Sequence, residues 1–159
     1  TYPLPEAQRD RFMATLSMGY PSRQAEIDML EHHAARNPLD DMAPVASARD
    51  VLEAIRATGE VFVHTAVKDY VVSIVDATRH DDLLRLGASP RASLQLVRAA
   101  KARAAIRGRG YVIPEDVSSL AVAVLGHRVL TSHHANAEQR TASDVVDGIV
   151  SRIPQPRRS

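Results

Sequence analysis

Arg91 is the residue whose type and position most directly suggest chemistry. Ser89-Pro90 predicts a helix start, because proline at the first helical position gives up an N–H that has no partner there anyway. Arg91 then falls in the first turn, where the helix dipole is positive and a cation is disfavoured. A bound phosphate would resolve this conflict, because helix N-termini and arginine both favour anions. The alternative is a solvent-facing arginine beside Gln95 and Arg98 on the polar face of the helix.

The motifs that would support phosphate chemistry independently are absent from the sequence. It contains no G-x-x-x-x-G-K-S/T segment, so no such loop of backbone amides can enclose phosphates. Residues 71–76, V-V-S-I-V-D, superficially resemble the apolar strand and Asp that hold Mg²⁺ in P-loop ATPases. Their apolar residues keep helical spacing and Ala77 follows the Asp, so a helix is the preferred interpretation.

The seven histidines do not predict a metal site. His32-His33 and His133-His134 are adjacent pairs, whose side chains diverge on a helix instead of converging on one ion. The sequence has no H-E-x-x-H segment and no Cys/His ligand spacing, which favours surface histidines. A Ser-His-Asp triad stays open, because its members need not be adjacent, but no G-x-S-x-G segment supports one.

The composition is that of a soluble globular protein with one domain, or a small domain and an appendage. The 159 residues are 45% hydrophobic and only 4% aromatic, so Leu, Val, Ile and Ala must fill the core, which favours helices. With a formal net charge of +1, no bulk charge argues for nucleic acid or a membrane as partner. The absence of cysteine excludes disulfides and is consistent with a reducing cytosol. No apolar run approaches a membrane span, no signal peptide is predicted, and the start at Thr1 suggests a piece of a longer protein.

The N-terminal part of the chain predicts one strand and one helix. Residues 12–18 alternate large apolar with smaller side chains and end at Gly19-Tyr20-Pro21, which predicts a short strand. Ser22 can cap the next helix, whose apolar face carries Ile27, Leu30 and Ala34. Asn37-Pro38 would stop this helix, and residues 39–44 would link two subdomains.

The remaining chain predicts a bundle of about four to six helices. The clearest stripe has the spacing i, i+3, i+4, i+7 and i+11, at Val67, Tyr70, Val71, Ile74 and Thr78. Further helices are expected from Ser47 to Gly59, from Pro90 to Arg107, from Pro114 onward, and after a capping box at Thr141 and Asp144. Residues 108–110 predict a turn, residues 111–113 a brief extended pairing, and residues 133–139 a loop.

Three segments carry a resemblance to a known family. Residues 2–12 read Y-P-L-P-E-A-Q-R-D-R-F and residues 19–21 read G-Y-P, similar to the stretch that follows sensor 1 in MoxR-type AAA+ ATPases. Residues 86–93, L-G-A-S-P-R-A-S, resemble the family's GASPRA motif, where sensor 2 opens a lid helix. Residues 107–117 resemble its turn into the following helix. The pattern departs at Arg9, where the family has an apolar residue, often Leu.

The resemblance implies a mainly α fold, with a helical-bundle AAA+ lid domain preceded by a short strand–helix remnant of the α/β ATPase core. The core remnant would cover residues 1–38 and the lid residues 39–159. Arg91 would be the sensor 2 residue, which contacts the γ-phosphate and couples the lid angle to the nucleotide state. Arg11 would be the arginine finger, offered in trans to ATP on a neighbouring subunit. The alternative for Arg11 is an ion pair with Asp10 or Glu6 of its own chain, and exposed pairs of that kind contribute little.

The family also implies what the whole protein does. It would be a cytoplasmic homo-oligomeric ring, expected to be a hexamer, that uses ATP and Mg²⁺ to mature or activate partner complexes as a chaperone. The partners implied are proteins with von Willebrand factor A domains, or metalloenzymes. The chain alone lacks the nucleotide-binding motifs and is expected to be inactive, with no cofactor of its own.

A second class of function is a stand-alone helical module that contacts nucleic acid or protein. Its basic residues would be Arg98, Lys101, Arg103, Arg107 and Arg109. Arg98, Lys101 and Arg103 do not share one helix face, and the net charge near zero weakens the electrostatic argument for nucleic acid.

Overall fold

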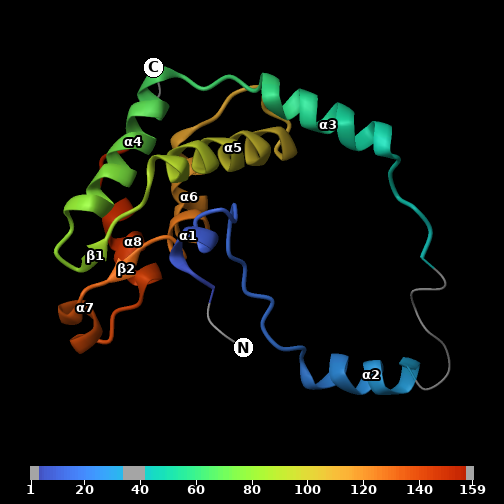
Figure 1. The fold of residues 1–159 in the computed structure, drawn as a ribbon. Coiled ribbons are helices and arrows are strands. Elements are labelled where there is room, and N and C mark those ends of the chain that lie inside the picture. Colours follow the sequence, from blue (N-terminus) through green and yellow to red (C-terminus); the bar gives the residue numbers. More distant parts are fainter. Residues whose placement is uncertain (1–3, 34–41, 157–159) are drawn as a thin grey trace. The chain divides into compact units, whose positions relative to one another are not determined.

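A computed structural model describes residues 4–33 and 42–156, with only the backbone at His32 and His33. The described chain is mostly helical, as the sequence predicts (Figure 1). The elements are α1 (Glu6–Arg9), α2 (Arg23–His33), α3 (Ala48–Glu60), α4 (Thr65–His80), β1 (Leu84–Leu86), α5 (Pro90–Ile106), α6 (Pro114–Leu125), β2 (Leu130–Thr131), α7 (His133–Ala137) and α8 (Ala142–Arg152). They fall into two units, one made of residues up to Thr15 and from Arg56 onward, the other of Leu16–Ile55.

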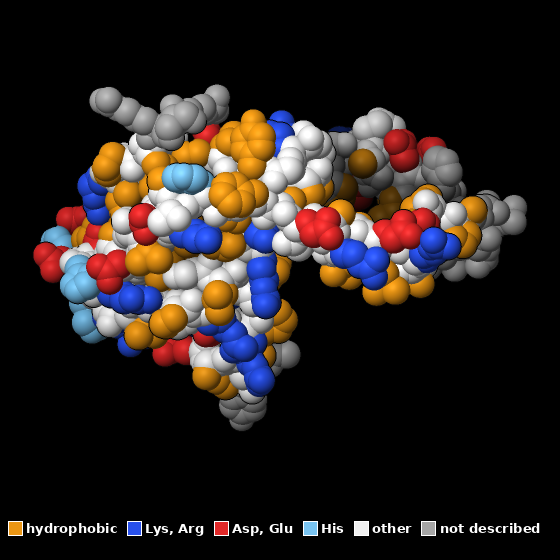
Figure 2. Space-filling model, turned by 90° about the horizontal axis from the view of Figure 1, so that it is seen from above, with side chains coloured by type: hydrophobic (Ala, Val, Ile, Leu, Met, Phe, Trp, Pro, Cys, Tyr) orange, Lys and Arg blue, Asp and Glu red, His pale blue; other side chains and the backbone are white. Residues whose placement is uncertain are grey.

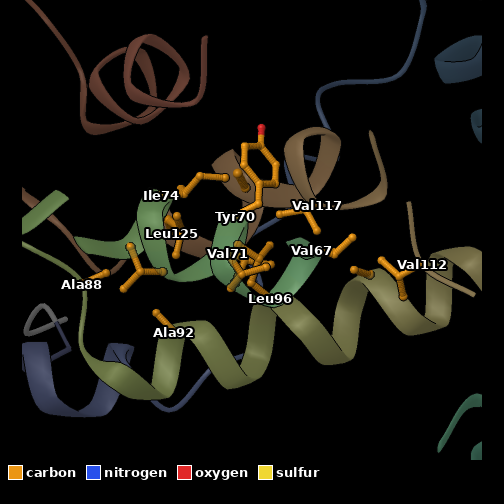
Figure 3. Close-up of a cluster of buried hydrophobic side chains, with 14 of the residues drawn as sticks. Val67, Tyr70, Val71, Ile74, Ala88, Ala92, Leu96, Val112, Val117 and Leu125 are labelled. Atoms are coloured by element: carbon orange, nitrogen blue, oxygen red, sulfur yellow. The ribbon is translucent and has the colours of Figure 1, made fainter. Parts of the chain in front are cut away.

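The larger unit is a helical bundle built around α4, α5, α6 and α8. The predicted α4 stripe is buried at all five positions: Val67, Tyr70, Val71, Ile74 and Thr78. It packs with an alanine-rich face of α5 (Ala92, Leu96, Ala100 and Ala104) and with the buried face of α6 (Val117, Ala121 and Val124) (Figure 3). The helix interpretation of residues 71–76 is therefore confirmed, and these residues do not form a metal-binding strand.

Helix starts were read correctly from the capping residues. Ser47 Oγ accepts the Asp50 N–H at 3.2 Å, while the Asp50 carboxylate accepts the Ser47 N–H at 2.7 Å. Thr141 and Asp144 form the same reciprocal box at the start of α8, and Ser22 accepts an N–H in the first turn of α2 at 3.2 Å. Such side chains satisfy N–H groups that the first helical turn leaves without partners. Local pairing thus determines where these helices begin.

The predicted strand over residues 12–18 is not formed. In the described chain this segment makes two backbone hydrogen bonds to other elements, from Phe12 N–H to Arg9 O of α1 at 3.1 Å and from Thr15 N–H to Ala123 O of α6 at 2.9 Å. A strand is stabilised by a ladder of such bonds to a neighbouring strand. No strand of the described residues pairs with this segment, and Phe12 and Met13 stay 57% and 45% exposed. The alternating pattern alone therefore does not produce a strand.

Residues 133–139 were wrongly predicted as a loop, because they contain the short helix α7. Ser132 Oγ accepts the Ala135 N–H at 3.3 Å, and Ala135 is fully buried. One buried alanine in a polar stretch produces no helical periodicity. Sequence analysis also did not predict the antiparallel pair of β1 and β2. The predicted pairing near residue 111 is confirmed as a parallel bridge between Phe62 and Tyr111.

The predicted boundary at residues 38/39 stays a prediction. Ala34, Asn37-Pro38 and most of the expected linker lie outside the described residues. Gly59 was expected to end its helix, but α3 continues to Glu60. No helix in the described chain is long and apolar enough to cross a membrane.

Gly87 lies where the GASPRA-like segment crosses the end of α4. A Cβ there would lie 2.5 Å from Thr78 O and 2.6 Å from Arg79 Cα, and these are backbone atoms that cannot rotate away. We expect Gly87→Ala to lower the free energy of unfolding by about 1–3 kcal/mol or more. Gly59→Ala is the matched control, because its Cβ would meet nothing within 4 Å in a helix, and alanine should be neutral or stabilising. Urea unfolding of both variants checks this, and equal midpoints would contradict it.

Candidate functional site

Arg91 occupies the first turn of α5, as predicted, and its side chain is exposed. Pro90 takes the first helical position and Ser89 the N-cap position, but Ser89 makes no side-chain cap. Its hydroxyl instead donates to the Asp10 carboxylate, at 3.1 Å from both oxygens. The N-terminus of a helix of 17 residues is thus left without a side-chain acceptor beside an exposed guanidinium. This arrangement favours an anion.

Arg11 follows α1 and its C-cap residue Asp10, and its side chain is exposed. The alternative interpretation paired it with Asp10 or Glu6, but both carboxylates have other partners. Asp10 lies 3.2 Å from Arg128 Nε, and Glu6 lies 3.7 Å from Arg85. Among the described residues, Arg11 has no ion pair.

Asp10 links the segment that carries Arg11 to the N-terminus of α5, which carries Arg91. Its carboxylate contacts the N-cap residue of the helix that carries Arg91, and Asp10 itself directly precedes Arg11. On its other side it pairs with Arg128, whose side chain is fully buried. Sequence reasoning missed Arg128. The available signal was a charged residue beside the apolar Val129-Leu130, three positions after the end of α6.

His127 supports the same segment. Its Nε2 lies 3.1 Å from Phe12 O. Burial lowers the pKa of His127, and the Phe12 carbonyl opposes this effect without reversing it. The neutral imidazole is thereby favoured, and as the Nε2–H tautomer it donates to the Phe12 carbonyl.

Three of the five basic residues of the second hypothesis have partners within the chain, while Arg98 and Arg107 are exposed. Arg109 makes a bidentate pair with Asp116 at 2.6 and 2.8 Å, and Arg103 lies 3.5 Å from the same carboxylate. Lys101 Nζ donates to Gly59 O at 2.6 Å. On the face drawn in Figure 2, several Lys and Arg side chains form a row bordered by hydrophobic ones, and most acidic side chains lie to either side. With three of the five residues paired within the chain, a continuous nucleic-acid surface gains little support.

Asp116 should be a stability residue. Burial acts to raise the pKa of this carboxyl, but the Arg109 guanidinium and the Ile113 N–H outweigh burial and lower it. A lowered folded-state pKa means that this stabilisation is present above the unfolded value of about 4 and is lost as pH falls through the folded value.

We expect Asp116→Asn to lower the free energy of unfolding by about 2–4 kcal/mol near pH 7, because Arg109 loses its counter-charge. Asp147→Asn, exposed on α8, should change it by less than about 0.5 kcal/mol. Urea titrations between acid and neutral pH check both expectations. A difference between wild type and Asp116→Asn that persists undiminished at the lowest pH would contradict the charge argument.

The pocket beside Phe62 is not lined by the two arginines. It has a volume of about 470 Å³ and is lined by Phe62, His64, Tyr111 and neighbouring residues, but not by Arg11 or Arg91. The described side chains include no group of three or more His, Cys, Asp or Glu that could hold a metal ion. His134 is exposed and lies 3.3 Å from Glu138.

Comparisons with known proteins identify the fold and the family. Residues 76–149 match the AAA lid domain family. The chain is 40% identical to the uncharacterized protein YeaC of Bacillus subtilis and 37% identical to the chaperone MoxR1 of Mycobacterium tuberculosis, in each case over 98% of this chain. It is also 29% identical to the protein MoxR of Methylorubrum extorquens, over 98% of this chain and 51% of that protein.

The chain spans about half the length of these relatives, 49% of YeaC and 43% of MoxR1. The crystal structure of a putative ATPase from Cytophaga hutchinsonii superposes with a TM-score of 0.88 and 30% identity, over 98% of this chain and 50% of that one. The relatives and the matching structure cover nearly the whole chain, and the lid-domain match covers residues 76–149 within it. The chain therefore belongs to the MoxR-type AAA+ ATPases and corresponds to their C-terminal portion, which contains the helical lid.

Proposed function

We propose that the chain completes the nucleotide site of a chaperone-like ring ATPase, with Arg91 acting in its own subunit and Arg11 in the neighbouring one. The observation that carries the proposal is the exposed Arg91 at an α5 N-terminus whose cap residue Ser89 bonds elsewhere. A cation in the positive first turn is unfavourable unless an anion is near. The terminal phosphate of ATP is an anion of the right kind.

Arg91, as sensor 2, would couple the angle of the lid to the state of the nucleotide. It is carried by α5, which packs on α4 and α6 in the centre of the bundle. A contact between Arg91 and the γ-phosphate would therefore move or hold the bundle as one body, and loss of that phosphate would release it. The physical requirement is a different interaction free energy in the two nucleotide states.

Arg11, as the arginine finger, would act on ATP bound to an adjacent subunit. Its exposed guanidinium has no ion pair among the described residues, so reaching a phosphate breaks no ion pair of its own chain. A rigid, planar and permanently charged group in that place stabilises the charge on a transferring phosphoryl group. This role requires a ring or another assembly that brings two subunits together.

The nucleotide cofactors belong to the whole protein. Arg91 and the uncapped N-terminus of α5 fit a phosphate group, and ATP with Mg²⁺ would be enclosed mainly by residues outside this chain. We propose that the chain by itself neither holds these cofactors nor hydrolyses ATP. When bound, Mg²⁺ would neutralise part of the phosphate charge.

The assembly we propose is a cytoplasmic homo-oligomeric ring, a hexamer, that matures or activates partner complexes. The support is the family, which includes a protein named as a chaperone in Mycobacterium tuberculosis. Proteins with von Willebrand factor A domains, or metalloenzymes, are the proposed clients.

The test is Mg²⁺-dependent ATP hydrolysis by the whole protein, measured together with its mass by light scattering. We expect turnover to rise with the fraction of protein in rings, because each site needs Arg11 from a neighbour. Residues 1–159 alone should give no turnover at any concentration. Full turnover by a monomeric whole protein would overturn the trans role of Arg11, and turnover by the chain alone would overturn its proposed dependence on other residues.

A further inference from the structure

Arg128 is a buried cation, and the free-energy cost of burying its charge must be compensated by its contacts. Its guanidinium has no exposed surface, and burial lowers the pKa of Arg128 while the Asp10 carboxylate partly restores it. Removing a charge from water costs several kcal/mol unless counter-charge and hydrogen bonds compensate. The chain must gain these contacts from the residues around Arg128.

The contacts of Arg128 are concentrated on the backbone around Arg11. Nε lies 3.2 Å from the Asp10 carboxylate. Nη2 donates to Asp10 O at 3.2 Å and also to Phe12 O. Nη1 donates to Met13 O at 3.1 Å and to Val124 O, the one partner outside this segment. The carbonyls of the residues before and after Arg11 are thus held by a single guanidinium.

Other contacts tie the same short segment to the bundle. His127 holds the Phe12 carbonyl, and Ser89 holds the Asp10 carboxylate. The Thr15 N–H donates to Ala123 O at 2.9 Å. Arg11 lies in the middle of this stretch, and its side chain is exposed, as are those of Phe12 and Met13. Its backbone has little freedom, although the segment forms neither a helix nor a strand.

We propose that Arg128 is a positioning residue for Arg11: it fixes the backbone at residues 10–13 so that the Arg11 side chain is presented in one direction to the adjacent subunit. The proposal rests on the proposed role of Arg11 as a finger in trans. Fixed presentation matters because a displacement of about 1 Å at a reacting group can lower a rate on the order of 10²-fold. The lid thereby sets the geometry of a residue that acts on another subunit's nucleotide.

The variant Arg128→Lys separates the effect of the positive charge from the effect of the guanidinium geometry. It keeps the positive charge beside Asp10, but one ammonium cannot reach the carbonyls of residues 10, 12 and 13 in the fork geometry of a guanidinium. In the whole protein we expect Arg128→Lys to lower ATP turnover on the order of 10²-fold while the KM for ATP changes little. A general loss of folding would instead reduce nucleotide binding and the melting temperature together.

Mixed rings show on which side of the interface the defect lies. In rings of Arg11→Ala and Arg91→Ala subunits, a site is intact when an Arg11→Ala subunit receives the finger of an Arg91→Ala neighbour. Random mixing in equal amounts makes about a quarter of the interfaces intact in a closed ring. If Arg128 positions the finger, Arg128→Lys mixed with Arg91→Ala recovers the same activity, and Arg128→Lys mixed with Arg11→Ala does not.

Each outcome decides one question. Recovery with Arg11→Ala instead of Arg91→Ala would place Arg128 on the side of its own subunit's nucleotide and overturn the proposal. Recovery with neither, while the Arg11→Ala and Arg91→Ala pair complements, would also overturn it. Failure of that reference pair to complement would overturn the proposed trans finger itself. If Arg128→Lys does not fold, Asp10→Asn replaces it in the same mixtures, because it removes the counter-charge with little change of shape. We again expect recovery with Arg91→Ala and none with Arg11→Ala.

Discussion

Replacing Arg11 with alanine is expected to lower ATP turnover of the whole protein by about 10³-fold while nucleotide binding is retained. In its proposed role, Arg11 contributes to the site of a neighbour and contacts no nucleotide of its own subunit. Its exposed side chain has no ion pair among the described residues, so its loss should hardly change folding stability. Steady-state turnover, fluorescent-nucleotide binding and thermal unfolding, measured on the same preparation, check the three parts.

Arg49 offers the matched control for Arg11. It is an exposed arginine on α3 in an i, i+4 pair with Glu53 at 2.9 Å, and such pairs contribute little. Arg49→Ala should therefore keep turnover within about twofold. If Arg11→Ala resembles this control, Arg11 is only a surface residue. Weak nucleotide binding by Arg11→Ala would place it in its own subunit's site and would equally contradict a finger in trans.

Replacing Arg91 with alanine is expected to lower ATP turnover on the order of 10²-fold, the scale for losing one preorganised donor to a charged transition state. The same change removes a cation from the positive end of α5, so it should leave the free energy of unfolding of the chain unchanged or raise it by a few tenths of a kcal/mol. Loss of activity without loss of stability is the signature of a residue kept for a ligand.

Arg98 on the same helix is the control for Arg91. It is also exposed, but it lies two turns from the N-terminus, away from the positive end of the dipole. Turnover and urea unfolding of Arg91→Ala and Arg98→Ala decide between a phosphate contact and a solvent-facing arginine. Equal activities of the two variants would support the solvent-facing interpretation and remove Arg91 from the site.

Much of the bundle follows from patterns that lie within a few residues of one another. The α4 stripe, the proline at the start of α5, the helix cap at Ser47 and the capping box at Thr141 all fall where the sequence predicts them. A helix buries one face at i, i+3 and i+4 and satisfies its first N–H groups locally, so its signals are contained in its own segment. The position of Arg91 in the first turn of α5 follows for the same reason.

Contacts between segments that are distant in the sequence had no comparable local pattern that would predict them. The pairing of β1 with β2 joins residues far apart in the chain, α7 depends on one buried alanine, and residues 12–18 lack the neighbouring strand that their alternation would require. The pairing of Arg109 with Asp116 and of Lys101 with the Gly59 carbonyl likewise appears only once the helices pack.

The candidate site likewise has a part that the sequence predicts and a part that only the tertiary structure determines. Residue order alone identifies the family-like segments and the two arginines within them. That Arg11 is exposed without an ion pair in the described chain, while Asp10 joins Ser89 to the buried Arg128, depends on residues 79 and 118 positions apart. A buried guanidinium selects its partners by where packing places carbonyls and carboxylates in space, and no spacing along the chain encodes that choice.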